Sequence, residues 1–380
     1  MYADSTDLST LALVFGAEVD AFCDVVFALQ VDAWRAGAEV AVLGVQEDWL
    51  EGEGVLRALV ADGEGEVCIR EFRPPLRPDV AWLLHLPLAD EQGRHRILSS
   101  ALRSALQVNP YPASERADDK ALAHQLWDGL PTPAWTLLPR ELPVPELRRR
   151  AEAFLRDYPY VVVLPDRGTE GRDVERFRAG DPRLWEHIGC ILRYDDVLLR
   201  EERGNLRFRD PEAGFRRFAL RVHVAWDGRC FRAESGFAQV APSEDAFPAS
   251  RGRGGEIRPI AEVLGNLYFR EGGRWRRWVP TEEDLVRVQE VSAGAAEALN
   301  RGLGEGERLC FLGLDLVCDL APDGSLVPVL LEVNPRPAGL QHARPIALQD
   351  RDLFVTSVLF WYIGGSQKVS ERSGELFGAI

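Results

Sequence analysis

The sequence predicts an α/β protein whose N-terminal part contains a parallel sheet. Two observations support this fold class. Residues 11–45 alternate between strand and helix signals, and residues 310–334 contain two apolar runs on either side of Asp323-Gly324. The chain has 380 residues, of which 46% are apolar and 28% charged, so it is long enough for two or three globular domains.

Residues 11–45 carry the signals of a βαβ unit. An apolar strand, LALVF, occupies 11–15, and EVAVLGV at 39–45 is a second one. Between them, residues 21–37 have apolar side chains at helical spacing and end on glycine, which is typical of a helix C-terminus. Further strands are expected at 79–86 and 106–110. No glycine-rich dinucleotide fingerprint follows the first strand, so a nicotinamide site is not supported.

The middle of the chain alternates between helices, strands and glycine-rich loops. Residues 111–140 predict a helix followed by a turn at Gly129, and a helix with Thr281 as its N-cap ends just before Gly302. The other expected elements are a charged helix at 145–157, a strand–glycine loop–strand unit at 160–177, extended segments within 191–240, a glycine/arginine loop at 247–260 and a hairpin at 268–279 about Gly272-Gly273.

Composition excludes several classes of function. A formal net charge of −15 argues against a nucleic-acid partner, which requires a basic surface. The sequence has no apolar stretch near 18 residues and no positively charged leader, so we expect neither a membrane span nor secretion. Its six cysteines are scattered without zinc-type spacing, which favours reduced thiols and a cytoplasmic location.

The hairpin at 310–334 brings polar residues together. With Asp323-Gly324 as a two-residue turn, Asp315 lies directly opposite Glu332, and Gly313 lies opposite Asn334 on the same face. Asp315 and Glu332 form a non-hydrogen-bonded pair, whose Cβ atoms are roughly 4.5–5.5 Å apart. The same register places Pro328 opposite Asp319 in another such pair, where a missing N–H is tolerated.

Two carboxylates this close repel each other unless a cation lies between them. The oxygen ligands of Asp315, Glu332 and Asn334 suit Mg²⁺ or Mn²⁺ better than zinc, and Gly313 leaves room for a bulky anion such as a polyphosphate. The alternative is that Asp315 faces solvent on an edge strand and that Glu332 pairs with an arginine.

The motif GLDLVCD…LLEVNPRPAGL resembles the closing hairpin of the ATP-grasp superfamily, in particular its glutathione-synthetase-like and D-alanine–D-alanine-ligase-like members. The resemblance implies two Mg²⁺ ions, with Mn²⁺ as an alternative, held by Asp315, Glu332 and Asn334. It also implies an α/β fold in which an N-terminal parallel-sheet domain precedes a two-lobed, α+β ATP-grasp domain. The expected boundaries are 1–112 for the first domain, 113–196 for the small lobe, 197–364 for the C-terminal lobe and 365–380 for a tail.

Other segments resemble ATP-grasp motifs in the same order. Lys120, one of only two lysines, matches the nucleotide-contacting lysine of the family. The VLLREE segment matches the adenine-binding hinge, which implies a role for Glu201 or Glu202. Arg221 and Arg253 match phosphate- and substrate-facing arginines, and Arg336 joins them as a candidate catalytic residue. The glycine loop that closes over the phosphates implies further ATP contacts from Arg167, Gly168, Thr169, Glu170, Gly171 and Arg172.

One position departs from the family pattern. The family places a second nucleotide lysine just before the proline of the glycine loop, and this chain has Leu164 there. Arg167 and Arg172 are the expected sources of the missing charge, although a guanidinium does not reproduce an ammonium group.

The resemblance implies an ATP-dependent carboxylate–amine ligase that forms an amide or peptide bond through an acyl-phosphate. The expected substrates are small molecules, a carboxylate and an amine, with an amino acid or small peptide as the family-level expectation. Related enzymes are often dimers, so a homodimer is consistent with the resemblance. Two alternatives stay open: an ATP-grasp phosphotransferase, and a nucleotide-binding relative without catalytic activity.

Overall fold

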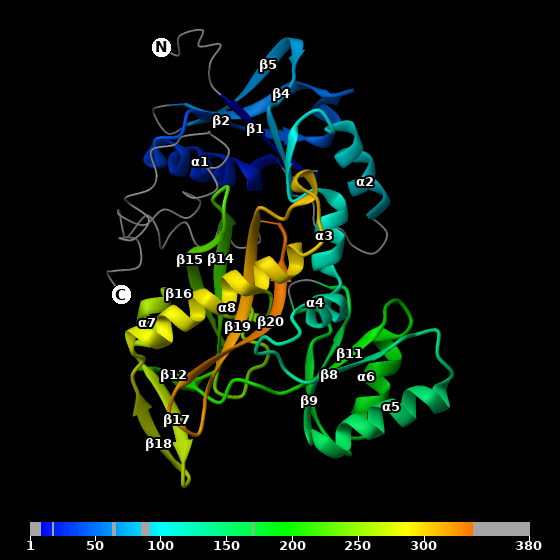
Figure 1. Ribbon diagram of the computed structural model, residues 1–380, viewed down its shortest axis with the longest axis vertical. Helices are drawn as coiled ribbons and strands as arrows, with labels where there is room; N and C mark the ends of the chain where they lie inside the picture. The colour runs from blue at the N-terminus through cyan, green and yellow to red at the C-terminus, as the bar shows by residue number, and fades with distance from the viewer. Residues whose placement is uncertain (1–8, 17–18, 63–65, 85–91, 169–170, 337–380) are drawn as a thin grey trace.

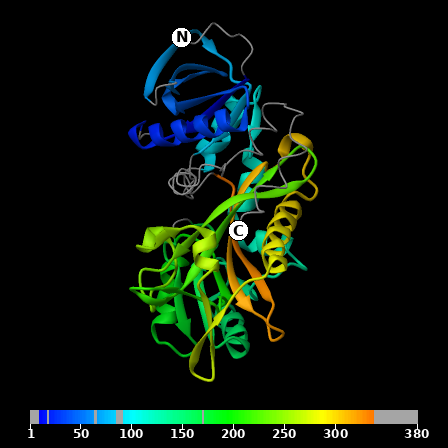
Figure 2. The ribbon, with the colours of Figure 1, turned by 90° about the vertical axis from the view of Figure 1, so that its left-hand side faces the viewer.

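The computed structural model describes residues 9–16, 19–62, 66–84, 92–168 and 171–336. The expected site residues Thr169 and Glu170 lie outside this part of the chain, as does everything beyond 336, including the expected tail at 365–380. An N-terminal sheet lies at one end of the molecule, a five-stranded sheet lies in the middle, and two four-stranded sheets lie at the other end (Figures 1 and 2).

The N-terminal sheet has a parallel centre, as the sequence predicts. Its strands follow the order β3-β4-β2-β1-β6-β7, with β5 paired to β4, and β2, β1, β6 and β7 are parallel. Helix α1 packs on one face of this sheet and α2 on the other, so β1 is apolar on both faces. The elements are β1 (Ser9–Phe15), α1 (Val19–Ala36), β2 (Val40–Gln46), η1 (Glu47–Trp49), β3 (Leu50–Glu51), β4 (Gly54–Ala61), β5 (Val67–Leu76), β6 (Val80–Leu83), α2 (Gln92–Ala101) and β7 (Leu106–Val108).

A pair of helices leads from this domain to the next sheet. They are α3 (Tyr111–Asp118) and α4 (Lys120–Leu126), where the sequence predicted one helix. The interruption is at Asp119, whose backbone is extended and whose carboxylate accepts the Leu122 N–H as an N-cap. This break places Lys120 at the first turn of α4.

A four-stranded antiparallel sheet follows the helix pair, and this sheet with helices α5 and α6 is called the small lobe below. Its strand order is β10-β9-β11-β8, and helices α5 and α6 cover one face. The other face carries Leu164, which lies opposite Leu198, and Arg200, which lies opposite Val162. The elements are β8 (Trp135–Leu138), α5 (Val144–Asp157), β9 (Tyr160–Pro165), β10 (Glu175–Arg178), α6 (Arg183–Ile191) and β11 (Val197–Glu201).

A five-stranded antiparallel sheet, in the order β16-β15-β14-β19-β20, lies at the centre of the molecule. Helices α8, α3 and α4 pack on one face, which buries the apolar residues of β14 and β19. The opposite face carries Arg221 and Asp315, which lie directly opposite each other on β14 and β19. The strands are β14 (Phe218–Trp226), β15 (Phe231–Val240), β16 (Glu256–Arg258), β19 (Phe311–Leu320) and β20 (Leu326–Asn334).

The remaining elements confirm two predictions. The hairpin about Gly272-Gly273 is present, and Thr281 caps α8 by a capping box with Asp284. The elements are β12 (Arg207–Asp210), β13 (Gly214–Arg216), η2 (Arg251–Arg253), α7 (Ile260–Leu264), β17 (Leu267–Glu271), β18 (Arg274–Trp278), α8 (Glu282–Asn300) and η3 (Glu305–Glu307).

Candidate functional site

The β19–β20 hairpin places Asp315 directly opposite Glu332 and Gly313 opposite Asn334, which confirms the predicted register at these positions. Asp315 is 6% exposed, and β19 lies between β14 and β20. The alternative in which Asp315 faces solvent on an edge strand is therefore wrong.

The turn of this hairpin differs from the prediction. Ala321 donates its N–H to the Ser325 carbonyl at 2.9 Å, so three residues form the turn instead of two. Pairing shifts by one as far as Leu316 and Leu330, and Pro328 lies opposite Cys318, not Asp319.

A β-bulge after this segment restores the predicted register. The extra residue is Leu331, which lies between the Leu316–Leu330 pair and the Asp315–Glu332 pair. A bulge directs two consecutive side chains toward one side of a strand. Leu331 and Glu332 accordingly both line the same pocket.

Arg221 holds the Asp315 carboxylate from the neighbouring strand. Arg221 Nε donates to Asp315 Oδ1 and Nη2 donates to Oδ2, both at 2.6 Å. The Arg221 side chain crosses above Gly313, where an added Cβ would lie 3.1 Å from Arg221 Cδ. The room above Gly313 that was expected to hold a polyphosphate is occupied by this arginine, so that expectation is wrong.

The two carboxylates have unequal proton affinities. Burial raises the pKa of Asp315 to about 6, with Arg221 opposing and the neighbouring Glu332 reinforcing the shift. Burial also acts to raise the pKa of Glu332, but Lys120, the hydrogen bond from Asp315, Arg221 and Arg200 together hold it below its ordinary value. Without a metal ion, the pair therefore retains a proton on Asp315 into the mildly acidic range.

The pair fits a magnesium ion that is bound together with a nucleotide. The described residues contain no cluster of three or more histidine, cysteine or acidic side chains that could hold a metal alone. Magnesium in nucleotide sites is usually held by one or two carboxylates, with phosphates and water supplying the other ligands. Asp315 keeps lone pairs beyond those that accept from Arg221, so it can bind a metal in this orientation.

Asn334, the third expected ligand, lies at the end of β20. Its Nδ2 donates to the Gly313 carbonyl at 3.4 Å, and it is not among the residues that line the pocket. Its amide orientation is therefore set by the hairpin itself.

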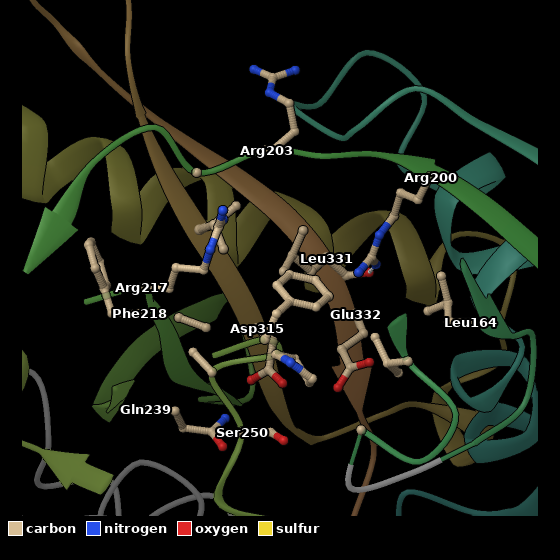
Figure 3. Close-up of a pocket in the computed structure, with 18 of the residues that line it drawn as sticks. Leu164, Arg200, Arg203, Arg217, Phe218, Gln239, Ser250, Asp315, Leu331 and Glu332 are labelled. Carbon is tan, nitrogen blue, oxygen red and sulfur yellow. Dashed lines mark hydrogen bonds between the residues drawn. The ribbon is translucent and has the colours of Figure 1, made fainter. Parts of the chain in front are cut away.

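Asp315 and Glu332 face a pocket between the small lobe and the central sheet (Figure 3). The pocket encloses about 790 Å³, including space open to solvent. Leu164 and Arg200 line it from the small lobe, and Asp315, Leu331 and Glu332 line it from the hairpin. Its other walls are Gly171, Val174, Arg203, Gly204, Leu206, Arg207, Arg217, Phe218, Ala219, Gln239, Phe247, Pro248, Ala249, Ser250 and Val317.

Lys120 anchors the start of the glycine loop. Its Nζ donates to the carbonyls of Asp166 at 3.1 Å and Gly168 at 2.8 Å, and its charge lowers the pKa of Glu332. Burial and the nearby Asp119 raise the pKa of Asp166 to about 6. Lys120 therefore connects the loop electrostatically to the hairpin, and among the described residues of the loop Gly171 lines the pocket.

The two loop arginines expected to replace the missing lysine lie elsewhere. Arg167 contacts Asp119, with Nη2 and Oδ2 3.4 Å apart, and Arg172 is exposed beside Asp173. Neither lines the pocket.

The other expected catalytic arginines contact different partners. Arg253 Nε donates to the Gly171 carbonyl at 3.2 Å, which places it over the glycine loop. Arg336 is buried and donates to both carboxylate oxygens of Asp118 at 2.7 Å. Arg336 therefore ties the end of the hairpin to α3.

The hinge glutamates Glu201 and Glu202 are not among the residues that line the pocket. Glu201 accepts the Ala134 N–H at 3.2 Å, and Glu202 pairs with Arg176 and Arg217, each at 2.7 Å. The pocket is instead lined by the flanking Arg200 and Arg203, together with Arg207 and Arg217, all missed by sequence reasoning. The alternation of β11 could have identified Arg200, because it shares a face with Leu198.

Comparisons with known proteins identify the fold. No protein-family model matches the sequence, and neither does any curated protein sequence. Solved structures do match: the D-cycloserine synthetase DcsG has 18% sequence identity over 90% of this chain and 99% of its own, with a TM-score of 0.53. The VanG D-Ala:D-Ser ligase from Enterococcus faecalis has 15% identity over 94% of this chain and 99% of its own, with a TM-score of 0.56.

A third structure agrees with these two. The D-alanine–D-alanine ligase from Coxiella burnetii has 12% identity over 93% of this chain and 94% of its own, with a TM-score of 0.56. The chain therefore has the α/β fold of the ATP-grasp D-alanine–D-alanine ligases, which confirms the predicted fold class. None of the described helices is long and apolar enough to cross a membrane.

Proposed function

We propose that this protein is an ATP-dependent ligase that joins a carboxylate to an amine. The observation that carries the proposal is the buried Asp315–Glu332 pair, which faces a pocket between two lobes of an ATP-grasp fold. Such a pair suits a magnesium-bound triphosphate, because the phosphates supply the ligands that the two carboxylates lack. The similar solved structures are ligases whose names specify D-alanine, D-serine or D-cycloserine as a substrate or product.

The reaction has two steps. A carboxylate is a poor electrophile, so its oxygen first attacks the γ-phosphorus of ATP, and the bond to the departing ADP oxygen breaks. The amine nitrogen then attacks the carbonyl carbon of the acyl-phosphate, phosphate leaves, and the nitrogen loses a proton. Phosphoryl transfer depends mainly on positioning and charge neutralisation.

The residues of this chain divide these tasks. Asp315 and Glu332 hold magnesium, with Asn334 as a third ligand, and Arg221 fixes the orientation of Asp315. Magnesium, when bound, neutralises negative charge on the phosphate oxygens. Lys120 holds the start of the glycine loop, whose backbone N–H groups are suited to phosphate oxygens.

The number of metal ions, the substrates and the roles of two further arginines are proposed from the fold and from the oxygen ligands of the site. We propose two magnesium ions, with manganese able to replace them, because both prefer oxygen ligands. An amino acid or a small peptide is the proposed carboxylate substrate, and a small-molecule amine is its partner. Arg253 contacts the glycine loop and Arg336 contacts α3. We propose that both arginines contribute to the reaction indirectly, by holding these two segments in position.

ADP release tests the proposal. Wild-type protein with Mg-ATP is incubated with pooled N-acetylated amino acids and peptides as carboxylates, with and without pooled amino acid amides as amines, beside Glu332→Ala. A ligase releases ADP only when both substrate types are present, and the variant releases none. ADP release that requires carboxylates alone indicates a phosphotransferase, and ATP binding without ADP release in any pool indicates a non-catalytic relative.

A further inference from the structure

Four arginines in the described part of the chain are buried, and three of them have a carboxylate partner. Arg216 pairs with Asp210 and Arg336 with Asp118. Arg221 pairs with Asp315. The fourth, Arg200, is 6% exposed and forms no ion pair with any carboxylate of the described residues.

The polar contacts of Arg200 are few. Its Nη1 donates to the carbonyl of the bulge residue Leu331 at 2.6 Å, and its Nε has no acceptor among the described residues. Burial lowers the pKa of Arg200 to about 10, while Glu332 and Asp315 oppose this shift from a distance. The guanidinium is thus cationic at neutral pH and buried, and its one hydrogen bond within the described part of the chain is to a neutral carbonyl.

A buried cation of this kind is costly unless an anion completes its environment. Arg200 lines the same pocket as Glu332 and Leu164, and its side chain extends toward the hairpin in Figure 3. Once Glu332 binds a metal ion, its negative charge no longer compensates the charge of Arg200. Leu164, on the same face of the small-lobe sheet, supplies no charge.

We propose that Arg200 binds a phosphate group of the nucleotide from the small-lobe side of the pocket. This inference rests on the proposed function, because it takes the pocket to hold a magnesium-bound nucleotide. A guanidinium offers several donors in a fixed plane and suits phosphate oxygens. Arg200 thereby provides a cation on the small-lobe wall, where the other described lining residues, Leu164, Gly171 and Val174, are uncharged. This role was expected of Arg167 or Arg172.

The competing explanation is structural. Arg200 would then serve only to bind the Leu331 carbonyl and hold the bulge that positions Glu332. The two roles differ in what can replace Arg200. Glutamine keeps an N–H donor for the Leu331 carbonyl and so preserves the bulge and the position of Glu332, but it lacks the charge that a phosphate contact uses.

The experiment measures Mg-ATP and adenosine binding by calorimetry in wild type, Arg200→Met, Arg200→Gln and Arg200→Lys, with thermal unfolding of each. Glutamine retains an N–H donor for Leu331 without the charge, and lysine retains the charge. Arg176→Met is the control, because Arg176 lies on β10 of the same sheet, separated from β11 by β9, and outside the pocket lining.

We expect the neutral variants to bind Mg-ATP about 10- to 100-fold more weakly, with adenosine affinity unchanged, and Arg200→Lys to recover part of the loss. Equal weakening of both ligands, or no weakening of Mg-ATP in a folded neutral variant, overturns the Arg200 assignment. If wild type itself does not bind Mg-ATP, the proposed function is wrong, and this result is distinct from a failure of Arg200 alone.

Discussion

Arg221 on β14 binds both carboxylate oxygens of Asp315 on β19, and the two residues lie directly opposite each other in the central sheet. The Arg221 side chain passes close to Gly313, where an added Cβ would lie 3.1 Å from Arg221 Cδ, so a side chain there would displace Arg221 slightly. One arginine therefore both compensates the charge of a candidate metal ligand and fixes its orientation, which makes this ion pair accessible to mutational tests.

Replacing Arg221 by methionine is expected to destabilise the protein by about 3–5 kcal/mol at pH 7, because Asp315 is then buried without its partner. Urea unfolding monitored by circular dichroism measures the change. The double variant Arg221→Met/Asp315→Asn should recover much of this stability. Strictly additive losses would show that the two residues do not stabilise each other.

Magnesium-nucleotide binding should weaken as the pH falls below about 6. The pKa of Asp315 is raised to about 6 in the folded protein, so below this pH the carboxyl carries a proton that a metal ion must displace. Titration calorimetry between pH 5 and pH 8 measures the affinity. Phosphates of the nucleotide also titrate in this range. The contribution of Asp315 is therefore the part of the pH dependence that is present in wild type and absent in Asp315→Asn.

The same shift affects stability with a defined sign. Between its ordinary pKa of 3.8 and about 6, Asp315 binds a proton in the folded state but not in the unfolded state. Its contribution to stability is therefore complete below the ordinary pKa and is lost as pH rises through 6. Unfolding of Asp315→Asn should lack this component, and an identical pH profile in both proteins would contradict the assignment.

Gly236 should not tolerate a side chain. A Cβ there would lie 2.3 Å from the Arg221 carbonyl oxygen and 2.8 Å from Ile260 Cδ1, so β14 and β15 would have to move apart. We expect Gly236→Ala to lower the free energy of unfolding by about 1–3 kcal/mol or more. Gly189→Ala in α6 is the matched control, because its Cβ meets no atom within 4 Å, and it should stabilise the protein by up to about 1 kcal/mol. Equal effects of both substitutions would contradict the packing described.

Asn109 connects the N-terminal sheet to the start of β19 and to the residue that follows β20. Its Oδ1 accepts the Cys310 N–H at 2.7 Å and the Phe311 N–H at 3.1 Å, and its Nδ2 donates to the carbonyls of Phe311 and Pro335. Asn109→Gly should cost about 2–4 kcal/mol by leaving these buried groups unpaired. Asn109→Ala should cost about 1 kcal/mol more, because φ is +54° at this position. Thermal unfolding of both variants tests the order, and equal stability of Asn109→Gly and wild type would contradict the connection.

The sequence predicted the βαβ unit, the capped helix α8 and the register of Asp315 against Glu332, because each depends on local periodicity or on one strong cap. The register was correct at the site for a partly wrong reason. A turn one residue longer than expected shifted the pairing, and the bulge at Leu331 shifted it back. Neither irregularity is visible in the alternation of apolar residues.

Tertiary contacts account for what sequence reasoning missed. Strands β4 and β5 extend the N-terminal sheet in antiparallel fashion, and no prediction included them. The positions of the Arg221 and Arg200 side chains depend on neighbouring strands. The alternation of β11 places Arg200 on the same face as Leu198, but it does not show that this face lines the pocket and that Arg167 and Arg172 lie outside it. Only the pairing of β9 with β11 shows that Arg200 shares a face with Leu164.

The most direct test of this account is magnesium-dependent nucleotide binding by wild type and Glu332→Gln, measured by calorimetry with and without Mg²⁺. Glutamine has nearly the same shape as glutamate but lacks the charge that a metal ion requires. We predict that Mg²⁺ strengthens ATP binding by wild type and that Glu332→Gln, while folded, loses at least about tenfold in affinity and most of the magnesium dependence. Unchanged magnesium-dependent binding in this variant would contradict the assignment of the Asp315–Glu332 pair as the metal site.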